Sequence, residues 1–384
     1  MHTNKIDYPF LPLREINSRF EPTLSAAVGT VVASGQYIGG NEVMQFEKSL
    51  AAMCGVENAV GLSTGLDALR LTLRAMVILG RLAKGDGVIV PANSFIASAL
   101  AIVDAGLVPV FAEPSTDDFL INAEEIDRLA SENVRAVMPV DLYGKLAVSR
   151  ELVDVCRRKG LLIIEDAAQA IGAVRTETDG VELHPGQGVD AAAFSFYPAK
   201  NVGALGDAGA VVTSDNELAT TIRALANYGE TKRYHCSLPG FNCRLDPIQA
   251  AILNVKLPYA NEENRLRRHN GIIYCNAIDK SGILLTPRMP EMGDAVHQFV
   301  VRCVGIDREV FRCKLRERGV ETAIHYPVAL NRQIAMSGYF DVSNPCPKAE
   351  MLSGQVVSLP VSSATSAADV TSIAGIINQI LKEL

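Results

Sequence analysis

Short apolar runs alternate with helical stretches between residues 88 and 213, and this alternation restricts the possible folds more than any other feature of the chain. The runs lie at residues 88–90, 108–111, 135–140, 161–164, 191–196 and 210–213. Uninterrupted apolar runs of this length are typical of strands buried on both faces, and stretches such as 149–159 between them have helical spacing. The pattern predicts an α/β fold with a mostly parallel sheet covered by helices on both sides.

The pattern changes near residue 245. Residues 245–257, 308–319 and 367–384 have helical spacing, whereas 297–302 is typical of a strand. A chain of 384 residues also exceeds the usual size of one hydrophobic core. We therefore predict a large domain at 1–245 and a smaller α+β domain at 246–384, with one long helix at 245–270 as the joint.

Composition excludes several classes of protein. A formal net charge of −7 argues against a general nucleic-acid binder, which needs a basic surface. The eight cysteines form no CxxC pair, which favours free thiols in a reducing cytoplasm and offers no metal site. No uncharged apolar run reaches the ~18 residues of a membrane span, and the N-terminus has no apolar signal core. We expect a cytoplasmic protein with small-molecule partners.

Lys200 follows the apolar run at 191–196, and Asp166 follows the run at 161–164. A lysine in such a place is usually a solvated surface residue, and an aspartate is often a helix N-cap. The apolar and aromatic neighbours of Lys200 favour its neutral, nucleophilic amine, because desolvation lowers the pKa of an ammonium. Strand ends of a parallel sheet share one crevice, so both side chains can face it. Pyridoxal 5′-phosphate (PLP) needs such a pair, an amine that forms an imine and an acid that holds the protonated ring nitrogen.

Further residues suit the other parts of such a cofactor. A helix begins near Thr64, Gly65 and Leu66, where exposed N–H groups and the positive end of the helix dipole favour a phosphate. The Ser195 hydroxyl can join that phosphate, Gln169 can bind the phenolic oxygen of the ring, and Phe95 can stack on its face. Each residue also has an ordinary structural explanation when taken alone. The lysine–aspartate pair is the observation that favours assigning all these residues to one cofactor site.

Five segments resemble the sugar-nucleotide aminotransferases of the DegT/DnrJ/EryC/StrS type, in the order of that family. They are 34–40 (SGQYIGG), 165–173 (EDAAQAIGA), 194–209 (FSFYPAKNVGALGDAG), 240–251 (GFNCRLDPIQAA) and 318–327 (RGVETAIHYP). The resemblance, which begins near residue 10, implies PLP, a type I aspartate-aminotransferase-like fold with a seven-stranded sheet, and a homodimer with shared active sites. Some family members carry histidine at the catalytic position and are dehydratases, so Lys200 places this chain with the aminotransferases.

The resemblance also implies a role for each candidate. It makes Lys200 the Schiff-base lysine, Asp166 the partner of the pyridinium nitrogen, Gln169 the contact of the phenolic oxygen and Phe95 the stacking ring. Phosphate ligands are then Thr64, Gly65, Leu66 and Ser195, with Asn242 reaching in from the other subunit. Candidates near the sugar nucleotide are Tyr37, Tyr228, His325 and Tyr326. Lys232 and Arg233 can meet a diphosphate, although a solvated charged loop explains them slightly better.

A closer resemblance to one branch of the family implies the substrates. The long helix-to-strand connection at 76–93, and leucine rather than threonine at position 66, resemble the branch that aminates dTDP-3-keto-6-deoxyhexoses with L-glutamate, for surface polysaccharides or glycosylated metabolites. Transfer at C4 of a dTDP- or UDP-linked keto-sugar is an alternative, and a non-catalytic PLP- or sugar-nucleotide-binding regulator is a weaker one. A nicotinamide dehydrogenase lacks support, because no GxGxxG follows an early strand. Asp141 and Asn331 replace histidines that are common in the family. These two differences leave the cofactor chemistry unchanged and bear on which sugar is bound.

Overall fold

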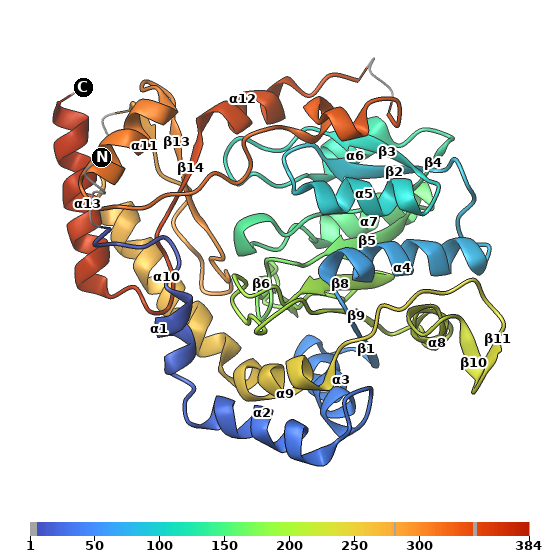
Figure 1. The fold of residues 1–384 in the computed structure, drawn as a ribbon. Helices are drawn as coiled ribbons and strands as arrows, with labels where there is room; N and C mark the ends of the chain where they lie inside the picture. The colour runs from blue at the N-terminus through green and yellow to red at the C-terminus, as the bar shows by residue number, and fades with distance from the viewer. Residues whose placement is uncertain (1–5, 280–281, 341–343, 384) are drawn as a thin grey trace.

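A computed structural model describes residues 6–279, 282–340 and 344–383 of the chain. The central sheet consists of β1 (Asn58–Leu62), β2 (Gly87–Pro91), β3 (Val108–Ala112), β4 (Val134–Val137), β5 (Leu162–Asp166), β8 (Ala191–Ser195) and β9 (Gly209–Thr213). Its order is β1-β9-β8-β5-β4-β2-β3 (Figure 1). Strand β9 is antiparallel to both neighbours, and the pairs from β8 to β3 are parallel. The predicted mostly parallel sheet is confirmed; β1 was missed because Gly61 interrupts its short apolar run.

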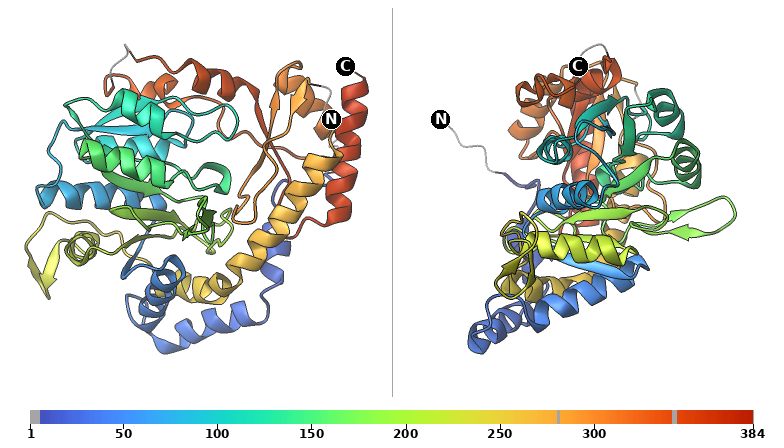
Figure 2. Two further views of the ribbon diagram at one scale, coloured as in Figure 1. Left: turned by 180° about the vertical axis from the view of Figure 1, so that it is seen from behind. Right: turned by 90° about the vertical axis from the view of Figure 1, so that its right-hand side faces the viewer.

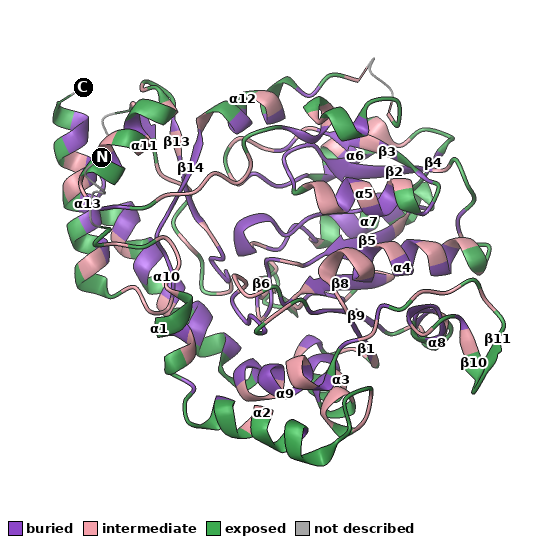
Figure 3. Ribbon diagram, viewed as in Figure 1, coloured by how far each residue is buried: buried purple, intermediate pink, exposed green. Residues whose placement is uncertain are grey.

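Helices cover both faces of this sheet (Figure 2). They include α3 (Asn41–Cys54), α4 (Gly65–Ile78), α5 (Ile96–Asp104), α6 (Ala123–Leu129), α7 (Arg150–Lys159) and α8 (Asn216–Ala226). Successive residues of a strand point to opposite faces. Accordingly, Val90 packs in the cluster of α4, α5 and α8, whereas Ile89 packs in the cluster of α6 and α7. The sheet is therefore buried between two helical layers (Figure 3).

The C-terminal part contains a second, smaller sheet. Its elements are α9 (Pro247–Lys256), α10 (Ala260–Ala277), β12 (Leu284–Leu285), β13 (Phe299–Cys303), α11 (Arg308–Glu317), α12 (Pro347–Gln355), β14 (Val356–Leu359) and α13 (Ala367–Lys382). Strands β12, β13 and β14 form an antiparallel sheet. Other short elements are α1 (Leu13–Ser18), α2 (Thr23–Ser34), β6 (Arg175–Thr176), β7 (Glu182–Leu183), β10 (Glu230–Lys232) and β11 (His235–Cys236). Within the described residues, no helix is both long and apolar enough to cross a membrane.

The single long helix expected at 245–270 is wrong. A 3₁₀ turn at Leu257–Tyr259 separates α9 from α10, because Pro258 lacks an N–H group and cannot continue an α-helix without a clash. Helix α9 packs on α2 and α3, whereas α10 packs on α13. Residues of the segment 329–349 return to the hydrophobic core of the large sheet. The domain division at 245/246 stays a prediction.

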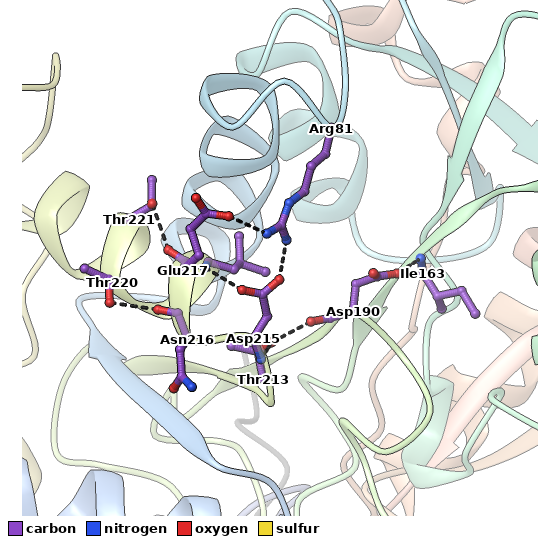
Figure 4. Close-up of polar contacts among 10 residues, drawn as sticks. Arg81, Ile163, Asp190, Thr213, Asp215, Asn216, Glu217, Thr220 and Thr221 are labelled. Atoms are coloured by element: carbon purple, nitrogen blue, oxygen red, sulfur yellow. Dashed lines mark hydrogen bonds and ion pairs between the residues drawn. The ribbon is translucent and has the colours of Figure 1, made fainter.

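Polar contacts fix the ends of β5, β8 and β9 that lie away from Asp166 and Ser195. Asp190, just before β8, accepts from Ile163 N–H at 2.7 Å and, through its carbonyl, from the Thr213 hydroxyl at 2.6 Å (Figure 4). Arg81 pairs with Asp215 and Glu217 beside them. These contacts set the relative positions of three strands, so the residues at their opposite ends meet at one edge of the sheet.

Candidate active site

A cavity of about 390 Å³ lies at the carboxyl ends of β5 and β8. Ten of the candidate residues line it: Thr64, Gly65, Leu66, Phe95, Asp166, Gln169, Ser195, Lys200, His325 and Tyr326. They come from five separate segments of the chain, and residues just outside β13 and β14 complete the wall. The side chains of Asp166 and Lys200 open onto the same space.

Asp166 is the last residue of β5 and is only 5% exposed. Its carboxylate accepts from the Ser98 hydroxyl at 2.7 Å and from the Ala168 N–H group at 3.2 Å. Burial raises the pKa of Asp166, while these two hydrogen bonds and the charge of Lys200 oppose that rise. The carboxylate is thus held in one orientation and suits a cationic partner in the cavity.

Lys200 lies in the loop after β8, where its N–H group donates to the Tyr197 carbonyl at 2.8 Å. Desolvation lowers the pKa of its ammonium to about 8, although the Asp166 carboxylate acts in the opposite direction. A substantial fraction of the side chain is therefore a neutral amine at mildly alkaline pH, and only this form is a nucleophile.

Tyr143 makes hydrogen bonds that join three separate segments around the cavity. Its N–H group donates to Gln169 Oε1 at 2.7 Å, its carbonyl accepts from His297 N–H at 2.9 Å, and its hydroxyl donates to the His325 carbonyl. Its φ of 62° is rare for a residue with a side chain and needs such support. Gln169 Nε2 donates to the Tyr326 hydroxyl at 3.1 Å and keeps a second hydrogen for a ligand.

Glycines permit the close approach of α4 to β8 and β9. Thr64 caps α4 by accepting from the Asp67 N–H group at 2.9 Å. A Cβ atom at Gly65 would lie 2.7 Å from Ser195 Cβ, and one at Gly209 would lie 2.2 Å from the Thr64 carbonyl carbon. The free N–H groups of the first turn of α4 thus lie beside the Ser195 hydroxyl, as a phosphate group requires.

Two buried histidines in the wall are neutral. Burial, followed by the charge of Lys200, lowers the pKa of His325 to about 4. The pKa of His297 is also far below its usual value, through burial and through the charges of Lys200 and Arg267. Asn201 uses its amide hydrogens on Asn264 Oδ1 and the Ala295 carbonyl, both at 2.8 Å. Its oxygen therefore accepts from His297 Nδ1 at 3.0 Å, which leaves Nε2 of His297 without a proton.

Three candidates do not line the cavity: Tyr37, Tyr228 and Asn242. Tyr37 is 54% exposed and Tyr228 is 52% exposed. The backbone of Asn242 pairs with Asn227, so Asn242 and Tyr228 are neighbours on one exposed surface. Lys232 and Arg233 are exposed on the β10–β11 hairpin at the right of Figure 1. None of these residues approaches the cavity within a single chain.

Sequence reasoning missed four residues of the site: Ser98, Tyr143, Arg267 and His297. Tyr143 lies two residues after Asp141, which the family resemblance had already singled out. Ser98 follows Phe95 by one turn of α5, but nothing in the local sequence connects it to Asp166. Arg267 and His297 had no local signal at all.

Comparison with known proteins decides the family. A model of the DegT/DnrJ/EryC1/StrS aminotransferase family matches residues 20–378. The chain belongs to this family. It is therefore an aminotransferase, as the resemblance predicted, and family membership implies dependence on PLP.

Individual relatives match this chain along almost its whole length. The chain is 40% identical to a dTDP-3-amino-3,6-dideoxy-alpha-D-galactopyranose transaminase of Aneurinibacillus thermoaerophilus, over 97% of this chain and 99% of that protein. The structure matches DesV of Streptomyces venezuelae, solved with a ketimine intermediate, with a TM-score of 0.92, 36% identity and full coverage of both chains. NtdA of Bacillus subtilis, solved with bound PMP, matches with a TM-score of 0.87 and 27% identity over 99% of this chain and 86% of that chain.

Proposed function

We propose that the cavity binds PLP, with Lys200 and Asp166 as the residues that carry the chemistry. The supporting observation is that one cavity brings together a buried carboxylate held by Ser98, an amine of lowered pKa and a glycine-lined helix start. Asp166 would hold the ring nitrogen, Gln169 the phenolic oxygen and Phe95 a ring face. Thr64, Gly65, Leu66 and Ser195 would hold the phosphate.

Bound PLP supplies an aldehyde for the amino group and a protonated ring that withdraws electrons from the reacting carbon. The chain supplies the proton movements. The Lys200 amine, whose lowered pKa increases its neutral fraction, would take a proton from the substrate carbon and return it at a neighbouring atom. Asp166, whose carboxylate form is favoured by the charge of Lys200, would keep the ring nitrogen protonated. The rings of Phe95 and Tyr326, whose centroids are 5.3 Å apart, form an aromatic wall.

The proposed substrates are L-glutamate as donor and dTDP-3-keto-6-deoxyhexose as acceptor. The relative from A. thermoaerophilus is named for a 3-amino group on a dTDP-linked sugar, and the connection at 76–93 supports the same carbon here. Since both substrates need the same cavity, they bind in turn and ping-pong kinetics are expected. Transfer at C4 remains the alternative acceptor chemistry.

A homodimer with shared sites is part of this proposal. Asn242 and Tyr228 lie together outside the cavity, and exposed Tyr37, Ile38 and Met44 form further apolar surface at the N-terminal helices. A second copy would bury these side chains and bring Asn242 to a neighbouring phosphate seat. Light scattering should give twice the mass of one chain.

The decisive experiment follows the visible absorbance of the purified protein. A yellow species should bleach with L-glutamate and return with the keto-sugar, and mass spectrometry and NMR of the product should place the new amine at C3. A Lys200→Ala variant should bind the cofactor only non-covalently and lose turnover by several orders of magnitude, whereas Lys232→Ala on the exposed hairpin serves as control. Near-normal turnover of Lys200→Ala would refute the assignment. Failure of the wild type to release 2-oxoglutarate with every plausible keto-sugar would favour a binding regulator.

A further inference from the structure

Arg267 is a buried cation in the wall of the cavity without a matching carboxylate. It lies on α10, is 3% exposed and lines the same cavity as Lys200. Its Nε atom is buried without a hydrogen-bond partner. The Nη1 atom donates only to the His297 and Val361 carbonyls, at 3.3 and 3.4 Å. No ion pair of Arg267 occurs within the described part of the chain, although burying an unpaired charge is costly.

The nearest acid of its own helix is already used. Glu263 lies one turn before Arg267 and is itself buried, but its carboxylate pairs with Arg19 at 2.7 Å and accepts from the Ser363 hydroxyl. Its charge acts on Arg267 only from a distance, and desolvation lowers the pKa of the guanidinium to about 10. A guanidinium in these surroundings remains charged near neutral pH and lacks an anion.

The position of Arg267 restricts which anionic group of a substrate it can bind. Lys200 and Arg267 both act on the neutral ring of His297, so the guanidinium lies in the surroundings of the reacting amine. The proposed phosphate seat belongs to other segments, at the start of α4 and at Ser195. In a nucleotide-linked sugar, several bonds separate the diphosphate from the keto carbon. In an amino acid, by contrast, the α-carboxylate is attached directly to the reacting carbon.

We propose that Arg267 binds the α-carboxylate of the amino donor and thereby orients its α-carbon toward Lys200. The inference rests on the proposed function. A planar guanidinium can bind a carboxylate through N–H···O bonds from its terminal nitrogens. His297 supports the same arrangement: its carbonyl accepts from Nη1 of Arg267 at 3.3 Å, and its unprotonated Nε2 accepts from Gln298 Nε2 at 3.4 Å.

The test measures binding of 2-oxoglutarate to the PLP-loaded enzyme by titration calorimetry, because this keto acid has no amine to transfer. Loss of a charged hydrogen-bond pair should raise the Kd of Arg267→Gln roughly 10- to 100-fold, and Arg267→Lys should show a smaller increase. Arg268→Gln is the matched control, since Arg268 follows on the same helix and donates instead to the Asp294 carbonyl at 2.9 Å. Its Kd should stay within about twofold of the wild type, and Tm is recorded for each variant.

A second comparison separates recognition from folding. The wild type should bleach at least tenfold faster with L-glutamate than with its α-amide at equal low concentration, and Arg267→Gln should lose this preference. An unchanged Kd for 2-oxoglutarate in Arg267→Gln, a raised Kd for dTDP instead, or a wild type that accepts the α-amide equally well would each overturn the inference. If the wild type does not bleach with glutamate at all, the proposed function fails. The Kd values for 2-oxoglutarate then still test whether Arg267 binds a carboxylate in the cavity.

Discussion

Replacement of Glu165 with glutamine should remove a pH dependence from the stability of the protein. Asp141 and Glu165 are both buried beside Asp166, and the carboxyl group of each acts on the pKa of the other. Oδ1 of Asp141 accepts from Ala147 N–H at 2.8 Å, and Oδ2 meets no donor among the residues that the structure describes. Two buried carboxylates repel each other and lose their hydration, so the folded state favours a proton on the pair.

The magnitude follows from the pKa of Glu165, which burial raises from 4.5 to about 7. At 1.36 kcal/mol per pKa unit, this shift corresponds to roughly 3 kcal/mol. Because the folded state holds the proton more tightly than the unfolded state, the stabilisation is complete below about pH 4.5. It is lost as the pH rises through about 7. An unfolding entropy of about 2.1 cal/mol/K per residue makes the loss equal to roughly 4 °C in Tm for the whole chain.

In Glu165→Gln, the side chain is neutral at every pH, its oxygen can still accept from the Gly186 N–H group, and no proton is needed. The Tm difference between this variant and the wild type should therefore grow by roughly 4 °C in favour of the variant between pH 5 and pH 8. Scanning calorimetry across this range measures it, with the exposed Glu151→Gln as control for loss of a glutamate. A Tm difference that stays flat with pH would show that the two carboxyls do not share a proton.

Three further substitutions test single contacts of the site. Ser98→Ala removes the 2.7 Å hydrogen bond to Asp166, so the pKa of that carboxyl should rise further and a pH–rate profile of the glutamate half-reaction should shift to higher pH. Gly65→Ala places a Cβ 2.7 Å from Ser195; dialysis against PLP should show weaker cofactor binding, and normal binding would argue against the phosphate seat. Thr64→Ala removes the cap of α4 and should cost about 1 kcal/mol of stability, which urea unfolding can detect.

Local sequence patterns carried the prediction of the fold and of the central pair. The apolar runs located six of the seven strands of the large sheet, and residues 149–159 correspond to α7 with Ser149 as its cap. Lys200 and Asp166 were found because each follows a strand of a mostly parallel sheet, so topology alone places them at one edge. The motifs at 165–173 and 194–209 then identified the family.

Tertiary structure decided the polar surroundings of that pair. Ser98 bonds Asp166 across 68 positions, and Tyr143 bonds His325 across 182. The cavity adds Arg267 from a helix that the sequence analysis treated only as a joint. A strand or a helix follows from the spacing of neighbouring apolar residues, since its hydrogen bonds are local or repeat along the backbone. The partner of a buried serine, tyrosine or arginine depends on how distant segments pack, and no periodicity along the chain records it.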